Sequence, residues 1–369
     1  MTDYSITLPS YTVGANAFDK IPSICKRAGR RAVIIGGRRA LAAAEQSIRD
    51  AMGQEVSAPP ALFYGGEASE ENIAALAACE EVLQADMIFA VGGGKALDTC
   101  KALAQQTDKP VFTFPTIAST CAATTAVSIL YHADGSFSHP YFLEGSPAHA
   151  FVNTQILAAA PDRYMWAGMG DTYAKFYESS ISSRGETLPH YHELGAVTAR
   201  MCVDPILRWG AQALADNQAG RATDALEQVV LAIVVTTGIA SILLTAEHTI
   251  DYNTGLAHAI FYALTSYPHI EKNHLHGEVV GFGVLLLLLA DKQYDTFVTL
   301  HQFMREVGLP VSPEEIELTK EEVLDVIPKV CGMPDIQHNP YPITVQLLTR
   351  AFEQLEEYNA TGKIADSVI

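Results

Sequence analysis

The feature that most constrains the fold is an alternation of short apolar runs with helical patterns between residues 30 and 116. Each run is rich in β-branched or aromatic residues and predicts a buried strand, and each intervening segment is long enough for a crossover helix. Strands and helices that alternate in this way predict a parallel, doubly wound sheet, which binds ligands at the carboxyl ends of its strands. The predicted strands are 30–37, 61–66, 86–94 and 110–116, and the predicted helices are 39–52, 70–84 and 95–107.

The pattern changes after Pro161, where long apolar-periodic stretches replace the strand runs. We therefore predict an α/β domain over residues 1–160 and an all-α domain over residues 161–369. Within the second part, Val229–Ala246 carries no charged residue for 18 residues, as a membrane span would. Acidic residues flank this stretch and no Lys or Arg anchors either end, which favours a buried core helix.

Charge and cysteine usage narrow the classes of partner and compartment. The net charge is −18 and the isoelectric point is about 5.0, so the chain would repel nucleic acid and anionic membranes. The six cysteines are widely spaced, and the first ten residues show neither a basic start nor an apolar core of a signal peptide. We expect a cytoplasmic protein with a small-molecule substrate, and neither nucleic acid nor a membrane as a partner.

A run of three glycines and a lysine connects the third predicted strand to the next helix. Gly93 and Gly94 would let the backbone approach a ligand closely, and Lys95 and the free N–H groups of the helix start favour a phosphate. Asp98 lies one turn into the helix. The spacing fits neither a Walker loop nor the GxGxxG fingerprint. A phosphate site is favoured, and a tight turn without a ligand is the alternative.

Among 42 acidic residues and twelve histidines, the pattern alone selects no metal site. Asp171 follows Gly-Met-Gly and by itself indicates a helix N-cap, whereas His258 lies in an apolar helix, as a core histidine would. His274 and His276 have the spacing of a strand-type pair. A set of two histidines and one aspartate would suit Zn²⁺ or Fe²⁺ with open positions for a substrate.

Six segments in a fixed order carry a family resemblance: GGGKALDTCKALA, PTIASTCAATTAVSILY, GMGDTYAKFYE, GLAHAI, HLHGEVVGFGVL and HNPYPIT. With these segments the chain resembles the glycerol dehydrogenase branch of the metal-dependent, iron-containing type of alcohol dehydrogenases, over residues 5–357. The resemblance implies a nucleotide-binding α/β domain, a helical metal-binding domain with the active site in a cleft between them, and a homo-oligomer.

The resemblance also implies roles for particular residues. The three metal ligands of the family fall on Asp171, His258 and His276, with His274 as a neighbour, and one divalent metal, Zn or Fe, is expected. The pyrophosphate of NAD(P)H would lie at the glycine turn, and further cofactor contacts would follow the next strand. The implied cofactor-binding residues are Gly93, Gly94, Lys95, Asp98, Thr116, Ser119, Thr125, Val127 and Tyr131.

One departure from the family pattern concerns the substrate. Glycerol dehydrogenases have an aspartate in an STDAP motif, where this chain has Cys121 within Ser119–Ala123. A polyol hydroxyl would lose an acceptor there, and an anionic substrate would lose a repelling charge. The motif resembles that of hydroxycarboxylate dehydrogenases, so we expect a 2-oxo acid/2-hydroxy acid pair. A glycerol or small-diol dehydrogenase is the alternative, and a dehydroquinate synthase-like lyase and a silent nucleotide-binding protein are more distant ones.

A second departure concerns the choice of nucleotide. Family members that prefer NAD usually have an acidic residue after the first strand of the nucleotide domain, where this chain has Gly36-Gly37-Arg38-Arg39. Gly37 would approach the cofactor, and Arg38 would tolerate or bind a 2′-phosphate. NADP(H) is therefore favoured over NAD(H). The alternative is that both arginines are solvated residues at a helix start.

Overall fold

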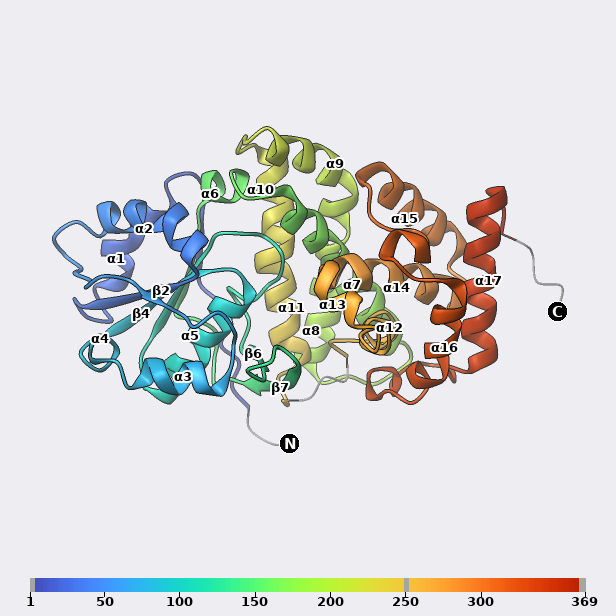
Figure 1. The fold of residues 1–369 in the computed structure, drawn as a ribbon, viewed down its shortest axis with the longest axis horizontal. Helices are drawn as coiled ribbons and strands as arrows, with labels where there is room; N and C mark the ends of the chain where they lie inside the picture. The colour runs from blue at the N-terminus through green and yellow to red at the C-terminus, as the bar shows by residue number, and fades with distance from the viewer. Residues whose placement is uncertain (1–3, 249–251, 365–369) are drawn as a thin grey trace. The chain divides into compact units, whose positions relative to one another are not determined.

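The computed structural model describes residues 4–248 and 252–364, which divide into two compact units (Figure 1). The first unit combines the chain up to Asp162 with Ala215–Ile242, and the second combines Arg163–Leu214 with the chain from Leu243 onward. The first break falls beside the expected boundary at 160. In contrast to our expectation, residues 215–242 belong to the first unit rather than the second.

Side-chain hydrogen bonds explain why residues 215–242 return to the first unit. Asn217 donates to the carbonyl oxygens of Ala158 and Ala160 at 2.8 and 3.0 Å. Thr124 donates to the carbonyl of Val234 at 2.5 Å. These partners lie far away in the sequence, so an apolar periodicity alone could not assign this helix to a unit.

A six-stranded, all-parallel sheet forms the centre of the first unit, within the described residues. Its order is β1-β8-β5-β4-β2-β3. The central strands β2, β4 and β5 are buried along their whole length, as expected for a sheet with covered faces. The strands are β1 (Tyr11–Val13), β2 (Ala32–Gly36), β3 (Leu62–Phe63), β4 (Met87–Gly92), β5 (Val111–Pro115) and β8 (His149–Val152).

One core cluster of this unit, on one face of the sheet, is rich in aromatic residues. Phe114 stacks on Phe151 and tilts against Phe89, with ring centroids 5.0 Å apart in both pairs. Because these residues come from β5, β8 and β4, their packing fixes the three strands against one another. The sheet edge at the carboxyl ends of the strands is thereby held in a defined register.

The parallel sheet confirms the fold class, and the four predicted strands occur as β2, β3, β4 and β5. The edge strand β1 and its neighbour β8 were missed, as was an antiparallel pair formed by β6 (Val127–Tyr131) and β7 (Phe137–Phe142). The predicted helix over 70–84 is broken at residues 78–79. The helices of this unit are α1 (Ile21–Cys25), α2 (Arg38–Met52), α3 (Glu70–Ala77), α4 (Glu80–Leu83), α5 (Gly94–Gln106), α6 (Thr154–Ala158) and α10 (Asp224–Leu231), with a short 3₁₀ turn, η1 (Ala17–Lys20).

The regular structure described in the second unit is helical, as predicted. Two helices, α9 (Asp204–Gln218) and α11 (Thr237–Leu244), each begin in one unit and end in the other. The remaining helices are α7 (Asp162–Ser182), α8 (His190–Ala199), α12 (Leu256–Leu264), α13 (Pro268–Asn273), α14 (His276–Ala290), α15 (Tyr294–Val307), α16 (Lys320–Val330) and α17 (Val345–Thr361), with the short turns η2 (Arg200–Cys202), η4 (Pro313–Ile316) and η5 (Pro334–Ile336).

The apolar stretch that resembles a membrane span consists of α10, a π-helical turn at Ala232–Thr236 and α11. Among the described residues, Asp224–Leu244 is long and apolar enough to cross a membrane by length and composition alone. However, 72% of its apolar window is buried within the protein. This burial agrees with the predicted core helix.

Candidate metal and dinucleotide sites

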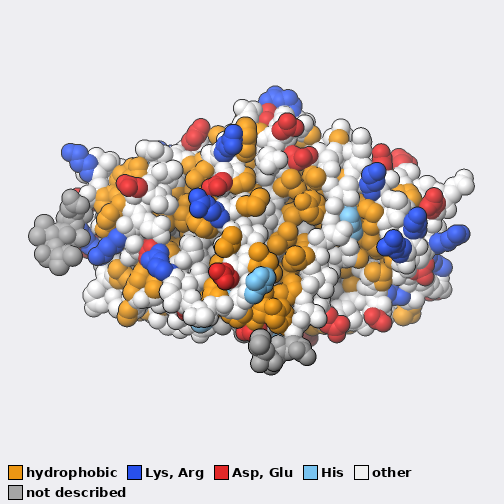
Figure 2. Space-filling model, turned by 180° about the vertical axis from the view of Figure 1, so that it is seen from behind, with side chains coloured by type: hydrophobic (Ala, Val, Ile, Leu, Met, Phe, Trp, Pro, Cys, Tyr) orange, Lys and Arg blue, Asp and Glu red, His pale blue; other side chains and the backbone are white. Residues whose placement is uncertain are grey.

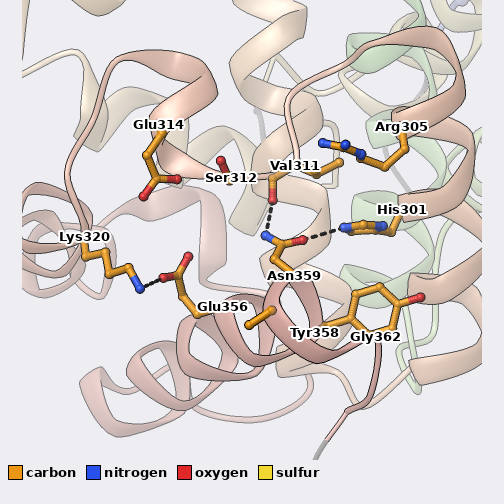
Figure 3. A pocket seen from close by; sticks show the side chains of 11 residues that line it. His301, Arg305, Val311, Ser312, Glu314, Lys320, Glu356, Tyr358, Asn359 and Gly362 are labelled. Carbon is orange, nitrogen blue, oxygen red and sulfur yellow. Dashed lines mark hydrogen bonds and ion pairs between the residues drawn. The ribbon is translucent and has the colours of Figure 1, made fainter.

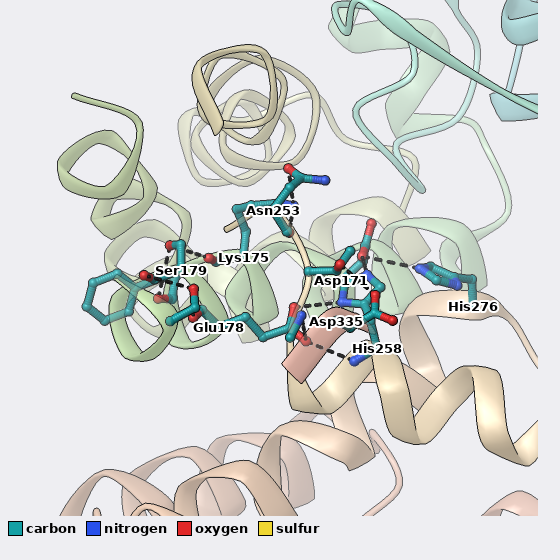
Figure 4. Close-up of polar contacts among 12 residues, drawn as sticks. Asp171, Lys175, Glu178, Ser179, Asn253, His258, His276 and Asp335 are labelled. Atoms are coloured by element: carbon teal, nitrogen blue, oxygen red, sulfur yellow. Dashed lines mark hydrogen bonds and ion pairs between the residues drawn. The ribbon is translucent and has the colours of Figure 1, made fainter. Parts of the chain in front are cut away.

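Asp171, His258 and His276 come together in the second unit from α7, α12 and α14 (Figure 4). One carboxylate oxygen of Asp171 lies 3.5 Å from Nε2 of His258 and 3.5 Å from Nε2 of His276. One ligand atom from each residue lies within 4.8 Å of the others. Three side chains that are distant in the sequence therefore form a single cluster of metal-ligating type.

Glycines allow the helices that carry this cluster to approach closely. A Cβ atom added to Gly170 would lie 2.1 Å from the carbonyl oxygen of Gly277, and one added to Gly277 would lie 2.1 Å from that of Ala167. No side chain fits at such distances. Because Gly170 and Gly277 are the sequence neighbours of Asp171 and His276, the contact between α7 and α14 brings these two side chains together.

Glu178 orients His258 and was not predicted from the sequence. Its carboxylate lies 2.6 Å from Nδ1 of His258 and accepts the backbone N–H groups of His258 and Gly255 at 2.8 and 3.0 Å. With Nδ1 facing a carboxylate, the ring presents Nε2 as its ligand atom. One feature of the sequence could have indicated this role. Glu178 follows Asp171 by seven residues, which is about two helical turns, so both side chains lie on the same face of the helix.

The charges of the site favour a cation. Burial by itself lowers the pKa of His258, but the carboxylates of Glu178 and Asp171 outweigh burial and raise this pKa to about 10. Burial by itself raises the pKa of Asp171, but the neighbouring His258 and His276 hold it well below its usual range. The carboxylates of Asp171 and Glu178 thus favour a positive charge at this position, which a bound metal ion would supply.

The donor set fits a divalent transition metal. Ligand atoms about 2.1 Å from a tetrahedral ion lie about 3.4 Å apart, close to the two distances of 3.5 Å found here. Two imidazoles and one carboxylate suit Zn²⁺ or Fe²⁺ and leave positions open for a substrate. The side chain of His276 is 36% exposed, so one side of the cluster is accessible.

His274 is not part of this cluster. Its Nδ1 lies 2.8 Å from the carboxylate of Glu278, which also accepts the backbone N–H of Leu275 at 3.0 Å. These contacts stabilise the first turn of α14. The structure thus gives His274 a role in the helix that carries His276, and the strand-type pairing that the sequence left open does not occur.

Replacing Glu178 with glutamine is expected to weaken metal binding about 10- to 100-fold, because the side chain keeps its size but loses the charge that orients His258. The dissociation constant for Zn²⁺ is measured by competition with a chromophoric chelator. Asp335→Asn is the matched control, since Asp335 is a buried carboxylate nearby that accepts a hydrogen bond from the Thr254 hydroxyl at 2.7 Å. Equal affinities of wild type and Glu178→Gln would refute the orienting role.

The predicted pyrophosphate residues lie at the turn from β4 to α5 in the first unit. Gly93 is the N-cap of α5 and Gly94 is its first residue, so the helix N-terminus opens onto this turn. Lys95 lies 2.6 Å from the carboxylate of Glu67 and 4.7 Å from the ring centre of Tyr131. The structure therefore brings two predicted residues, Lys95 and Tyr131, into contact, and adds an acidic neighbour that the sequence did not reveal.

Three other predicted cofactor residues meet around a buried lysine. Nζ of Lys101 lies 2.9 Å from the Asp98 carboxylate and donates to Thr125 Oγ1 at 2.9 Å and to the carbonyl of Val127 at 2.6 Å. Burial raises the pKa of Asp98, and Lys101 partly offsets the effect. Asp98 is thus engaged inside the protein, and Lys101 anchors the segment between β5 and β6.

The remaining predicted residues lie at two places on the carboxyl edge of the sheet. Thr116 follows β5, and its backbone N–H donates to the carbonyl oxygen of Gly92 at 3.1 Å. Ser119 and Cys121 lie on the half-buried turn that follows Thr116. Gly37 is the N-cap of α2, and the exposed Arg38 lies over the Phe63 ring at 4.6 Å. Because β2 and β4 pair in parallel with Gly36 opposite Val91, the turns after both strands share this edge.

A cavity of about 590 Å³ lies elsewhere in the second unit, beside α15 and α17 (Figure 3). It contains none of the predicted site residues. Its lysine and arginine already have acidic partners, since Lys320 pairs with Glu356, and Arg305 lies 3.0 Å from Glu315.

Comparison with known proteins identifies the family. The sequence model of iron-containing alcohol dehydrogenases matches residues 9–154. The glycerol dehydrogenase of Thermotoga maritima is 35% identical over 313 residues, which cover 82% of each chain. The chain belongs to the iron-containing alcohol dehydrogenase family. As a member of this family it is an oxidoreductase that acts on alcohols.

Two further relatives of this alcohol dehydrogenase differ in the substrate that their names state. Hydroxycarboxylate dehydrogenase A of Escherichia coli (strain K12) is 33% identical, and the match covers 89% of this chain and 90% of that protein. The crystal structure of glycerol dehydrogenase from Schizosaccharomyces pombe matches with a TM-score of 0.85 at 26% identity, covering 98% of this chain and 92% of that one. The architecture of a parallel-sheet domain with a helical domain is therefore that of the family.

Proposed function

We propose that this alcohol dehydrogenase oxidises glycerol or a similar small vicinal diol, and reduces the corresponding ketone, with NAD(P)(H) and one divalent metal. The cluster of Asp171, His258 and His276 carries the proposal, because it supplies a three-ligand site with open positions. The sequence-based expectation of a 2-oxo acid has weaker support. Relatives at 35%, 32% and 31% identity are glycerol dehydrogenases.

In this proposal, one group of residues binds the metal and another binds the nucleotide. Asp171, His258 and His276 would hold the metal, and Glu178 keeps Nε2 of His258 directed at the site. When bound, a divalent metal supplies Lewis acidity that favours the alkoxide form of an alcohol. Lys95 and the N-terminus of α5 would bind the pyrophosphate, which fixes the position of the nicotinamide for hydride transfer.

A 2-hydroxy acid is the second candidate substrate, and Cys121 favours it. A thiol at this position offers neither the strong acceptor that a polyol hydroxyl could use nor a charge that would repel a carboxylate. The E. coli hydroxycarboxylate dehydrogenase among the relatives supports this candidate. Both candidates share the metal site and the dinucleotide site, so they differ only in the substrate pocket.

NADP(H) is the nucleotide that we propose as preferred. Arg38 and Arg39 are exposed at the start of α2, and the guanidinium of Arg38 is held over the Phe63 ring. A guanidinium in a fixed position suits a 2′-phosphate. A lower KM for NADP⁺ than for NAD⁺ supports the proposal, and the opposite order would refute it.

The proposed reaction is tested by absorbance at 340 nm with protein reconstituted with Zn²⁺ or Fe²⁺. Glycerol and small diols are offered with NAD⁺ or NADP⁺, and 2-oxo acids are offered with the reduced nucleotides. Turnover of polyols supports the proposal, and turnover of 2-oxo acids alone supports the second candidate. Consumption of substrate without a net change in nucleotide would instead indicate a lyase.

Introducing the carboxylate that glycerol dehydrogenases have tests the role of Cys121. We expect Cys121→Asp to raise the ratio of kcat/KM for glycerol to that for a 2-hydroxy acid about 10- to 100-fold. This factor corresponds to the free energy of one hydrogen bond to a charged group. Cys121→Ser is the control, because it removes the thiol without adding a charge. An unchanged ratio would show that residue 121 does not contact the substrate.

A further inference from the structure

Glu67 places a carboxylate in a fixed position beside the glycine turn. The residue lies in the segment between β3 and α3, and its side chain is 17% exposed. One carboxylate oxygen accepts the backbone N–H of Ala68 at 3.0 Å, and the backbone carbonyl of Glu67 accepts the side-chain amide of Asn72 at 2.9 Å. The other carboxylate oxygen lies 2.6 Å from Nζ of Lys95. Contacts other than the one with Lys95 therefore hold Glu67 in place.

The ammonium of Lys95 is held between this carboxylate and an aromatic ring. Lys95 lies in the first turn of α5, against which both α3 and β6 pack. Its Nζ lies 4.7 Å from the ring centre of Tyr131, at the end of β6, and the backbone N–H of Tyr131 donates to the carbonyl of Ala68 at 2.8 Å. The side chain of Lys95 is 47% exposed, so a ligand can reach it. The cation at this helix start thus has an anionic partner before any nucleotide binds.

A pyrophosphate at the glycine turn would need the same ammonium. It carries two negative charges, and two anions that share one cation at close range repel each other. Because Ala68 and Asn72 hold Glu67 independently of Lys95, the charge of Glu67 would stay beside a bound pyrophosphate. The carboxylate therefore opposes the binding of the ligand that Lys95 attracts.

The charge of the whole chain makes local cations decisive for an anionic ligand. The net charge is −18, which does not attract a dinucleotide over long distances. On the face drawn in Figure 2, the lysine and arginine side chains lie among acidic and hydrophobic ones. The extent to which Lys95 is neutralised should therefore be visible in the affinity for the nucleotide.

We propose that Glu67 competes with the pyrophosphate of the dinucleotide for Lys95, and that it thereby weakens nucleotide binding and speeds nucleotide release. This inference rests on the proposed dinucleotide-dependent function. The competition has a use in such an enzyme, because the release of a product often limits turnover. Glu67 acts through Lys95 and takes no part in hydride transfer, so its removal should change the affinity and the dissociation rate of the nucleotide.

Replacing Glu67 with glutamine tests the proposal, because the side chain keeps its size and loses its charge. The dissociation constants of NADPH and NADH, measured by fluorescence titration of the full-length protein, should fall about 10-fold. The dissociation rate in stopped-flow experiments should fall by a similar factor. Glu70→Gln is the matched control, since it makes the same charge change on an exposed residue at the start of α3 and should leave both quantities unchanged.

Two further readouts separate competition for Lys95 from a structural effect. Inorganic pyrophosphate, used alone as a competitor of the nucleotide, should show an inhibition constant that falls by the same factor in Glu67→Gln. The affinity of the variant should also decrease more steeply with salt, because Lys95 is no longer neutralised. Circular dichroism verifies folding, and Glu67→Ala should act in the same direction.

The proposal is overturned if the wild type binds the nucleotide and Glu67→Gln binds it equally or more weakly, since Glu67 would then be neutral or would orient Lys95 for the ligand. Equal tightening in Glu70→Gln, or an unchanged inhibition constant for pyrophosphate, would also overturn it. Absence of saturable nucleotide binding by the wild type would instead refute the proposed function itself, and this inference with it.

Discussion

Replacing His258 with alanine is expected to lower kcat for alcohol oxidation by at least about 10³-fold, because one of the three proposed metal ligands is lost and with it several kcal/mol of stabilisation of the developing charge. The dissociation constant of the dinucleotide should change by less than about threefold, since residues of the first unit would bind it. Steady-state rates at 340 nm and a fluorescence titration with reduced nucleotide measure the two quantities.

The matched control for this variant is His274→Ala. His274 lies close to His276 in sequence, yet its Nδ1 lies 2.8 Å from the Glu278 carboxylate in the first turn of α14, and its Nε2 lies 3.6 Å from Glu317. Its removal is expected to leave kcat within about threefold of the wild-type value. Near-normal turnover by His258→Ala, or an equal loss in both variants, would contradict the assignment of the ligands.

Replacing Lys101 with methionine is expected to destabilise the protein by about 3–5 kcal/mol, because the change leaves the buried carboxylate of Asp98 without its partner. The hydrogen bonds that Lys101 donates to the Thr125 hydroxyl and to the carbonyl of Val127 are lost as well. The free energy of unfolding is measured by denaturant titration, followed by a probe in the first unit. A loss below about 1 kcal/mol would show that the buried pair contributes little.

A second substitution separates the buried charge from the loss of packing. Adding Asp98→Asn to Lys101→Met removes the uncompensated charge, so the double variant should recover part of the lost stability. The single variant should also become relatively more stable as the pH falls, because a carboxyl whose pKa is raised in the folded state binds protons more readily there than in the unfolded chain. A pH-independent defect would assign the loss to packing alone.

The central strands were predictable from the sequence because each is a continuous apolar run. β2, β4 and β5 are buried on both faces, so their residues need no alternation with polar ones. β1 and β8 have only three and four residues and become strands through pairing: β1 pairs with β8, and β8 pairs with both β1 and β5. Such short segments carry no periodicity from which a strand could be recognised.

The three residues that we propose as metal ligands were predictable only in part. On local pattern, Asp171 indicated an N-cap and His258 a core histidine, and the family resemblance selected them together with His276. The structure supplies the physical reason for their meeting, namely the close approach of α7 and α14 at Gly170 and Gly277. Glu178 escaped prediction because its role depends on a contact with α12, which lies some 80 residues further along the chain.

The central claim is that Asp171, His258 and His276 form one divalent-metal site in an alcohol dehydrogenase. Anomalous X-ray diffraction from crystals of the protein loaded with Zn²⁺, collected on both sides of the zinc absorption edge, tests the claim most directly. The account predicts one anomalous peak per chain, about 2.0–2.2 Å from the Asp171 carboxylate and from Nε2 of both histidines. A peak at other residues, or no peak among these three in fully loaded protein, would contradict it.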